Sequence, residues 1–320
     1  MSPRVSVVLP IYNYARYLDQ RIQSLLAQDF SDFEIIAVDD GSTDGSLAVV
    51  EKYARDPRIR TVRHDTNGGL PYLRWNEGAA LAKGEYLLFA GADDYCVATL
   101  LRRLVALMDA HPKMGIAHAR SWMIDPDGNR MALLPRGARY ASDFIADAAD
   151  EAAYLFRVNT VPNASAVLLR RSVFEACGAF DTSMRLCADW MLWARMLTMS
   201  EVGYIATALN SFRTHRRTLR ALEGPKWLIP EQYEVMGFMT QAFNLPADVR
   251  EPAFDRIARE FLPRLRQVRT AEQLSHEWRT WRVGRAVDPA FSRRMSRLLI
   301  ERLTRGLRPR ARAGSAATPE

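Results

Sequence analysis

Two carboxylates at the end of a short apolar run constrain the fold of this chain more than any other feature. Residues 86–90 form a continuous apolar run typical of a buried strand, and Asp93 and Asp94 follow it closely. Adjacent carboxylates repel each other, and burial strengthens the repulsion, so the pair requires a compensating partner. Ligands of open α/β sheets bind beyond the carboxyl ends of the strands, where these residues are expected to lie. We interpret the pair either as a divalent-cation site or as a strand end that caps a helix starting near Val97, although capping accounts for only one carboxylate.

Strand-like and helix-like segments alternate along the first part of the chain. Strands are predicted at residues 5–9, 33–38, 59–62 and 86–90, and helices at 18–28, 46–54 and around 73–81. This order predicts βαβ units with right-handed crossovers, and hence a mainly parallel sheet flanked by helices. Polar turn-forming residues follow the strands at 10–14 and 39–45. The sequence therefore predicts an α/β fold with ligand-binding loops along one edge of the sheet.

The best-known nucleotide-binding loops are missing from the sequence. The first strand ends in Pro-Ile-Tyr-Asn, without a glycine, where a dinucleotide-binding fold has Gly-x-Gly-x-x-Gly. There is also no Gly-x-x-x-x-Gly-Lys-Ser/Thr phosphate-binding loop. We therefore expect neither an NAD or FAD site nor a P-loop.

The net charge of +7 is concentrated near the C-terminus. Eleven arginines but only three acidic residues lie from Arg279 onward, so the remainder is close to neutral and we expect no nucleic-acid partner. Three cysteines without metal-ligand spacing (Cys96, Cys177 and Cys187) favour a reducing compartment. No apolar stretch approaches the length of a membrane span, and the N-terminus leads directly into a strand. We therefore expect a cytoplasmic protein, either soluble or peripheral on the inner face of the cell membrane.

Four linked motifs resemble those of the inverting family 2 glycosyltransferases. They are Val-Val-Leu-Pro-Ile-Tyr-Asn at 7–13, Val-Asp-Asp-Gly-Ser-Thr-Asp at 38–44, Asn-Gly-Gly at 67–69, and Ala-Lys-Gly-Glu-Tyr at 82–86 followed by Asp93 and Asp94. The motifs keep the family's order and spacing over about residues 5–215. The resemblance implies the GT-A fold, in which an α/β domain binds a nucleotide-sugar donor.

The resemblance assigns residues to the donor side of the site. Tyr12 would stack near the base, Asp40 would accept a hydrogen bond from a ring N–H of the base, and Asp39 would support that turn. Uracil and thymine offer such an N–H, so UDP- or dTDP-sugars are the favoured donors. The alternative is that both aspartates only terminate the strand. Arg74 would approach the diphosphate, or else lie on a solvated helix face. The other donor-binding candidates are Pro10, Asn13, Gly68 and Asp93.

The acidic pair would correspond to the family's Asp-x-Asp element. The resemblance implies that Asp93 and Asp94 hold the ribose and a Mn²⁺ or Mg²⁺ ion, because hard cations bind carboxylate and phosphate oxygens. Gly91 stands where the family usually has its first aspartate, and this departure weakens the inference of metal use. His215, in a Phe-Arg-Thr-His stretch that resembles the family's Tyr-Arg-x-His element, is a further candidate for the metal or the diphosphate. The alternative is that it is a structural histidine.

Residues 186–196 (Leu-Cys-Ala-Asp-Trp-Met-Leu-Trp-Ala-Arg-Met) resemble the family's Glu-Asp-Trp-x-Leu-Trp-x-Arg helix start. The resemblance implies that Asp189 is the general base of a single displacement, which requires a base next to the acceptor hydroxyl. Ala188 replaces the family's glutamate. The alternative is that Asp189 is only an N-cap, in which case asparagine would replace it with activity intact.

The chain beyond about residue 220 is expected to be helical. We predict a catalytic domain at 1–220, a helical C-terminal region at 221–307 and a disordered basic tail at 308–320. Helical spacing covers 227–243 and resumes at 254–269. A final helix has Phe291, Met295, Leu298, Leu299 and Leu303 on one stripe and Arg293, Arg294, Arg297 and Arg305 on the other. Such a helix either lies on an anionic membrane, which residues 279–312 would contact, or docks on the protein with its arginines in solvent.

Three functional hypotheses follow from the sequence. The first is an inverting glycosyltransferase that moves a sugar from a nucleotide donor to a hydroxyl of a glycan or lipid-linked acceptor, as in surface polysaccharide or glycoconjugate synthesis. The second is a catalytically decayed nucleotide-binding or scaffold protein on the same fold, suggested by Gly91 and Ala188. The third is an unrelated α/β enzyme such as a nucleotidyltransferase, although residues 10–14 lack the glycine- and lysine-rich loop of that class. The sequence does not specify the oligomeric state.

Overall fold

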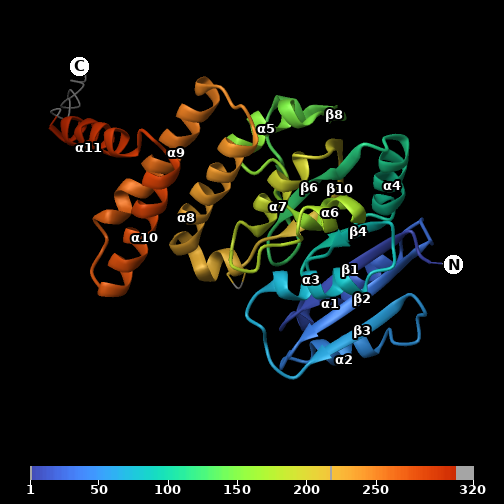
Figure 1. Ribbon diagram of the computed structural model, residues 1–320. Helices are drawn as coiled ribbons and strands as arrows, with labels where there is room; N and C mark the ends of the chain where they lie inside the picture. The colour runs from blue at the N-terminus through green and yellow to red at the C-terminus, as the bar shows by residue number, and fades with distance from the viewer. Residues whose placement is uncertain (1, 217, 308–320) are drawn as a thin grey trace, which may run out of the picture.

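The computed structural model describes residues 2–216 and 218–307 (Figure 1). Within these ranges, ten strands form one sheet with the order β3-β2-β1-β4-β9-β6-β10-β5, while β7 pairs with β6 and β8 pairs with β10. The strands are β1 (Val5–Ile11), β2 (Phe33–Asp40), β3 (Ile59–His64), β4 (Tyr86–Phe89), β5 (Tyr95–Cys96), β6 (Met114–Ile124), β7 (Arg130–Leu134), β8 (Phe144–Ala146), β9 (Val167–Arg170) and β10 (Glu201–Arg213). The helices that accompany them are α1 (Ala15–Leu26), α2 (Ser46–Glu51), α3 (Pro71–Leu81), α4 (Leu100–Ala110), α5 (Ala148–Arg157), α6 (Arg171–Ala176) and α7 (Ala188–Leu197).

The first four strands of the sheet are parallel, as the sequence predicts. Strand β1 pairs in parallel with β2 and β4, and β2 pairs in parallel with β3. The other half of the sheet is mixed, because β9 is antiparallel to both β4 and β6 while β10 is parallel to β6. The parallel pairing places the carboxyl ends of β1, β2 and β4 at the same edge. The helix after the acidic pair, predicted to start near Val97, begins three residues later with α4 at Leu100.

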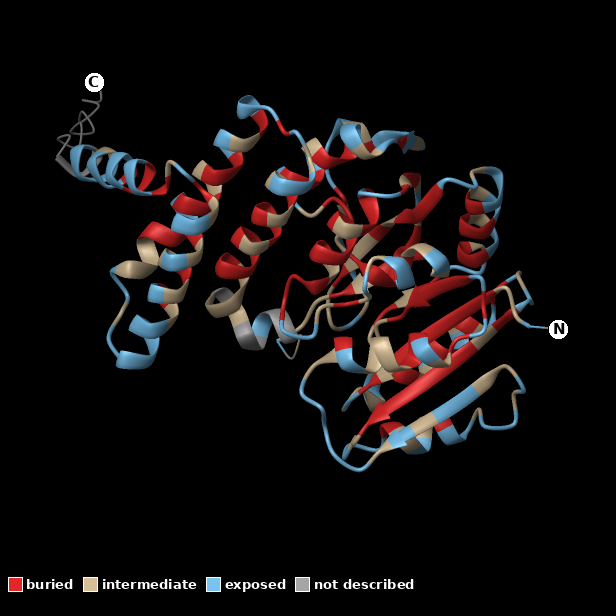
Figure 2. Ribbon diagram, viewed as in Figure 1, coloured by how far each residue is buried: buried red, intermediate tan, exposed pale blue. Residues whose placement is uncertain are grey.

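Alternate residues of the strands pack on opposite faces of the sheet. Val8, Ile36 and Leu87 belong to one apolar core, together with residues of α3, α5 and α7. Val7, Ile35 and Leu88 belong to a second core, with residues of α1 and α4. The central strands are therefore buried on both sides, which explains their continuous apolar runs (Figure 2).

Four further helices form the C-terminal region at the left of Figure 1: α8 (Leu219–Ala242), α9 (Ala247–Leu265), α10 (Ala271–Val287) and α11 (Phe291–Leu307). Tyr233 of α8 and Phe254 of α9 lie in the same core as Trp193 of α7, so these helices pack against the sheet domain. The domain boundary near residue 220 remains a prediction. The first of these helices was predicted from 227 but begins at Leu219, because the Thr218 hydroxyl accepts the N–H of Ala221, and the helix kinks at Gly224.

The arginines of α11 do not all face solvent, contrary to the sequence prediction. Arg294 is only 4% exposed and pairs with Asp288, Asp255 and Glu251. Leu299 and Leu303, predicted to lie on the packed stripe, are exposed. Burial of the guanidinium is compensated by three carboxylates, so α11 docks through a buried ionic cluster as well as through apolar contacts. None of the helices in the described ranges is long and apolar enough to cross a membrane. The predicted tail at 308–320 lies outside the described residues.

Candidate functional site

The loop after β1 is tied to the loop after β2. Asn13 has a left-handed backbone (φ 58°), which asparagine tolerates, and its side-chain oxygen accepts the N–H of Thr43 at 2.8 Å. The N–H of Asn13 donates to the Ser42 hydroxyl at 3.1 Å. Gly41 is required in the second loop, because a Cβ there would lie 2.8 Å from the carbonyl carbon of Thr66. These contacts fix the polypeptide around Pro10 and leave Tyr12 42% exposed, as a residue that stacks on a nucleobase would need to be.

Asp39 and Asp40 are both buried, with different partners. Asp40 Oδ1 accepts the N–H of Gly68 at 2.9 Å and Nε of Arg74 at 2.6 Å. Asp39 Oδ2 accepts the N–H of Ser42 at 3.3 Å, while Oδ1 is buried without a hydrogen bond among the described residues. Arg74 therefore forms ion pairs with Asp40 and Glu77 and does not lie on a solvated helix face. The predicted contact of Arg74 with a diphosphate remains a prediction.

The structure brings Asp93 and His215 together. Nε2 of His215 lies 3.0 Å from Oδ2 of Asp93, and the imidazole stacks on Tyr17 with ring centroids 5.5 Å apart. Both side chains are largely buried, at 13% and 8% exposure. Tyr14 lies nearby, and burial together with the charges of Asp93 and Asp94 holds its pKa well above the usual range. This aromatic surround lowers the local polarity and strengthens the interaction of the carboxylate with a cation.

Asp94 is buried and faces inward. Its Oδ1 accepts the N–H of Arg213 at 2.8 Å, and Ser165 supplies a further hydrogen bond. Burial and the neighbouring Asp93 charge raise the pKa of Asp94, whereas the guanidinium of Arg21 opposes the rise. Asp94 thus holds the turn through these contacts, whereas Asp93 pairs with His215, and metal binding by Asp94 remains a prediction.

Sequence reasoning missed Arg21, Arg213 and Ser165 as parts of this site. The side chain of Arg213 donates to the carbonyl oxygen of Asp93 at 2.8 Å and to Gln20 at 2.8 Å. The guanidinium of Arg21 is fully buried and makes no hydrogen bond within the described residues. A signal was available for Arg21, because a cation interrupts the apolar face of a predicted helix between Leu18 and Leu25.

A side chain at position 91 would be crowded by three side-chain oxygens. A Cβ at this position would lie 3.0 Å from Oδ2 of Asp94, 3.2 Å from Oδ1 of Asp93 and 3.2 Å from Oγ of Ser165. The N–H of Gly91 also donates to the Ser165 hydroxyl at 2.8 Å. The family's missing aspartate is thus replaced by a tight turn in which both remaining carboxylates approach the backbone.

The side chains at this site could bind a cation together with a substrate that supplies further ligands. Within residues 2–216 and 218–307, no cluster of three histidine, cysteine or acidic side chains could hold a metal alone. Asp93 and His215 together offer a carboxylate oxygen and an imidazole nitrogen. Mg²⁺ and similar cations are commonly held by one or two protein ligands plus substrate phosphates and water, which is what this pair allows.

Asp189 lies in the first turn of α7, not at the N-cap position predicted for it. The N-cap is Cys187, and Oδ1 of Asp189 accepts the N–H of Trp190 at 2.6 Å. No side chain of the described residues caps α7, and the carboxylate of Glu231, in α8, instead accepts the N–H groups of Arg185, Leu186 and Cys187, which precede the helix. The N-cap interpretation of Asp189 is therefore wrong.

Helix α3 connects the donor loops to the segment before α7. Arg74 of this helix pairs with Asp40, and Asn76, half a turn later, exchanges two hydrogen bonds with the backbone of Phe180 (2.9 and 3.1 Å). Tyr72 stacks on the Phe180 ring at 5.6 Å. The segment before Asp189, the predicted general base, is thus attached to α3. The same helix carries Arg74, which pairs with Asp40, the carboxylate predicted to bind the nucleobase.

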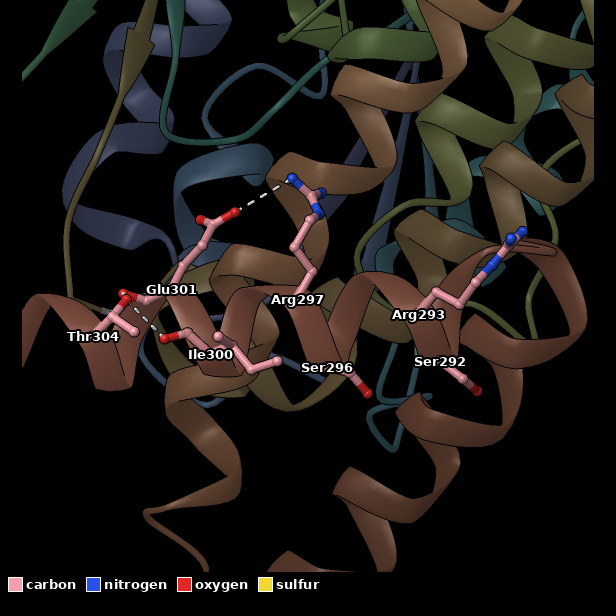
Figure 3. Close-up of a pocket in the computed structure, with 7 residues that line it drawn as sticks. All are labelled: Ser292, Arg293, Ser296, Arg297, Ile300, Glu301 and Thr304. Atoms are coloured by element: carbon pink, nitrogen blue, oxygen red, sulfur yellow. Dashed lines mark hydrogen bonds and ion pairs between the residues drawn. The ribbon is translucent and has the colours of Figure 1, made fainter.

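Two surface hollows lie away from these residues. Figure 3 shows one along α11, lined by Ser292, Arg293, Ser296, Arg297, Ile300, Glu301 and Thr304. Arg297 there is paired with Glu301 at 3.4 Å and with Asp255 at 2.6 Å. The other lies by the amino ends of β1 and β2 and includes Asp32, Glu34 and Lys83. Neither is at the carboxyl edge of the parallel strands, so the site is defined by the converging polar residues.

Known proteins resemble this chain in sequence and in fold. EpsJ of Bacillus subtilis, an uncharacterized glycosyltransferase, is 45% identical over 105 residues, which cover 32% of this chain and 30% of EpsJ. TarS of Staphylococcus aureus, a poly(ribitol-phosphate) β-N-acetylglucosaminyltransferase, is 37% identical over 110 residues, which cover 34% of this chain and 19% of TarS. The matched segment thus spans less than a third of the length of these two relatives.

Solved structures match over most of the chain. The structure of S. aureus TarS 1–349 with UDP-GlcNAc has a TM-score of 0.68 at 18% identity, covering 91% of this chain and 83% of that one. The mannosyltransferase PcManGT of Pyrobaculum calidifontis, with GDP-Man and Mn²⁺, has a TM-score of 0.57 at 16% identity, covering 97% and 82%. These likenesses confirm the predicted GT-A fold.

The model of the family described as "Glycosyl transferase family 2" matches residues 6–178, more than half of the chain. The chain therefore belongs to glycosyl transferase family 2.

Proposed function

We propose that this protein is an inverting glycosyltransferase that moves a sugar from a nucleoside-diphosphate donor to a hydroxyl of a glycan or lipid-linked acceptor. The observation that carries the proposal is the Asp93–His215 pair at the carboxyl end of β4, next to the loops ordered by Asn13 and Asp40. UDP- and dTDP-sugars are the favoured donors because of the family resemblance, in which Asp40 would accept the N3–H of uracil or thymine. TarS and PcManGT, solved with UDP-GlcNAc and with GDP-Man and Mn²⁺, support a nucleotide-sugar donor and a divalent cation.

In this proposal each residue has a defined task. The exposed Tyr12 ring stacks on the base, and the Asn13–Thr43 contact holds that loop in place. Asp93 and His215 would hold Mn²⁺ or Mg²⁺ with the diphosphate, and the cation would stabilise the charge of the departing nucleoside diphosphate. The bond between the anomeric carbon and the diphosphate oxygen breaks while the acceptor oxygen attacks from the opposite face. Asp189 accepts the hydroxyl proton, so no covalent intermediate forms.

A release assay tests this function directly. Purified protein is incubated with UDP-GlcNAc, UDP-glucose, a dTDP-hexose or GDP-mannose, with and without Mn²⁺, and nucleoside diphosphate is quantified. We expect release from one uridine or thymidine donor, reduced about 100-fold or more in Asp189→Asn. Asp147→Asn is the matched control, since Asp147 is a true N-cap whose side chain accepts the N–H of Asp150. Nucleotide binding without turnover in the wild type would favour the decayed-scaffold hypothesis.

We also propose that the C-terminal helices contact an anionic membrane surface that presents the acceptor. Leu274 and Trp278 lie one turn apart on α10 and are strongly exposed, Trp278 at 64%. The exposed Arg282 and Arg285 continue toward the C-terminal end of the same helix. An aromatic side chain next to arginines is the combination that binds the interface of an anionic bilayer.

A further inference from the structure

A carboxylate of the C-terminal region is buried against the segment that leads into α7. Oε1 of Glu231 accepts the N–H of Arg185 at 2.8 Å. Oε2 of the same side chain accepts the N–H groups of Leu186 and Cys187 at 2.8 and 2.9 Å. Glu231 is fully buried, so these three backbone donors replace the water that an ionised carboxylate would otherwise bind.

This contact is well suited to hold the segment in one geometry. Hydrogen bonds from N–H groups to an ionised acceptor are roughly twice as strong as neutral ones. Three successive N–H groups on one carboxylate also fix the backbone torsions of the turn, which continues directly into the first residue of α7. A negative charge at the start of a helix is further favoured by the helix dipole.

A second contact attaches the same segment to the C-terminal helices. The guanidinium of Arg185 lies 5.1 Å from the ring centre of Trp227, one turn before Glu231 in α8. The guanidinium of Arg279 in α10 lies 4.8 Å from the same ring and pairs with Glu234. The turn before α7 is therefore anchored by α8 and α10, both of which lie beyond the segment matched by the family model.

We infer that Glu231 is a positioning residue for the general base. It acts through the backbone of residues 185–187, which fixes the first turn of α7 and hence the carboxylate of Asp189, two residues beyond the anchored segment. The inference rests on the proposed function, in which Asp189 is the base. It gives the C-terminal helices a part in catalysis: they set the geometry of the acceptor side while the sheet domain binds the donor.

The variant Glu231→Gln tests this role, because the amide keeps the size of the side chain but places an NH₂ group against backbone donors. We expect kcat for nucleoside-diphosphate release to fall roughly 10- to 100-fold, since small misplacements of a catalytic group have effects of this size. The affinity for UDP, measured by calorimetry, should change less than about twofold, because the donor contacts lie on the sheet domain. The control is Glu260→Gln, which removes a surface ion pair with Arg256 in α9.

A double-variant comparison separates positioning from general loss of structure. If Glu231 acts through Asp189, adding Glu231→Gln to Asp189→Asn lowers the residual rate no further. An equal loss of rate in both backgrounds, or a folded Glu231→Gln enzyme with wild-type kcat, would overturn the inference. Should Glu231→Gln not fold, Glu231→Asp takes its place: faster hydrogen exchange in residues 185–190 with reduced kcat supports the role, and faster exchange with unchanged kcat refutes it. A wild type without activity on any donor instead overturns the proposed function itself.

Discussion

Nε2 of His215 lies 3.0 Å from Oδ2 of Asp93, although 122 residues separate them in the sequence. The pair joins the end of β4 to the residues that follow β10, and it places one nitrogen and one carboxylate at the edge where the donor loops converge. The contact satisfies the carboxylate in this structure, and in the proposed function both groups would serve as ligands of a cation.

Removing either member of this pair should abolish the effect of a cation on nucleotide binding. We expect Asp93→Asn and His215→Asn each to weaken UDP binding in the presence of Mn²⁺ about tenfold or more, and to leave metal-free binding nearly unchanged. Calorimetric titrations with UDP, dTDP and GDP, with and without Mn²⁺, measure this. Asp127→Asn is the control, because Asp127 is an exposed acidic residue paired with Arg16. Cation-dependent binding that survives in both site variants would contradict the assignment.

Arg74 is expected to matter for the stability of the donor site. Its guanidinium is the cationic partner of the buried Asp40, so Arg74→Ala leaves that carboxylate with only the Gly68 N–H. Breaking a buried ion pair by removing one partner costs about 3 kcal/mol, which denaturant unfolding would detect as a lower midpoint. The matched control is Arg102→Ala, which removes an exposed pair with Asp29 and should cost less than about 0.5 kcal/mol. Equal midpoints for the two variants would show that the Asp40 pair is not a stabilising contact.

Restoring the family's usual aspartate at position 91 should not improve the site. The new Cβ would lie 3.0 Å from Oδ2 of Asp94, and a third carboxylate would join two that already repel each other. We expect Gly91→Asp to lower the melting temperature without Mn²⁺ and to recover part of the loss when Mn²⁺ is added. Gly91→Ala, which adds the Cβ without a charge, separates the steric effect from the electrostatic one. A Gly91→Asp protein more stable than the wild type without metal would contradict this reasoning.

The sequence predicts the parallel half of the sheet well, because strand periodicity is local information. The runs at residues 33–38 and 86–90 become β2 and β4, and the polar residues after them lie at the same sheet edge because parallel strands align their carboxyl ends. The fold class follows from the same pattern.

The partners of the site residues were not predictable, because they come from distant segments. Nothing near Asp40 in the sequence indicates that Arg74 donates a hydrogen bond to its carboxylate. Similarly, nothing near Asp189 indicates that Glu231 binds the backbone of the residues before α7. The burial of Arg294 has the same origin: helical spacing placed it on a solvated face, but Asp288 and two carboxylates of α9 compensate its charge inside. Such pairings are set by tertiary packing, which periodicity along one helix does not report.

The exposed face of α10 offers a test of membrane contact. We expect the wild type to co-sediment with vesicles that contain about one third anionic lipid, and Trp278→Ser to bind several-fold more weakly, because a buried tryptophan ring contributes about 2 kcal/mol at such a surface. Met131→Ser removes a similarly exposed apolar side chain from β7, on the sheet domain, and serves as the control. Equal sedimentation of the Trp278 and Met131 variants would exclude this face as the contact.

A buried histidine should make the protein sensitive to mild acid. His118 in β6 is buried beside Tyr204, with ring centroids 4.9 Å apart, and its Nε2 has no hydrogen bond among the described residues. Burial, and to a smaller extent the charge of Arg139, lower the pKa of His118 to about 3. The unfolded chain therefore binds a proton at this residue near pH 6.5, whereas the folded chain does not do so until about pH 3. The stability contributed by neutral His118 is complete above pH 6.5 and falls as the pH decreases from 6.5 to about 3.

The size of this effect follows from the proton uptake of the unfolded state. Between pH 7 and pH 5, one such histidine lowers the free energy of unfolding by about 2 kcal/mol. His118→Leu, which fills the site with an apolar side chain, should lose this part of the pH dependence, so its unfolding midpoint should fall less from pH 7 to pH 5 than that of the wild type. His111→Gln, at the end of α4, is the control because it leaves His118 in place. Parallel pH profiles for the wild type and His118→Leu would show that His118 is protonated in the folded protein as readily as in the unfolded chain.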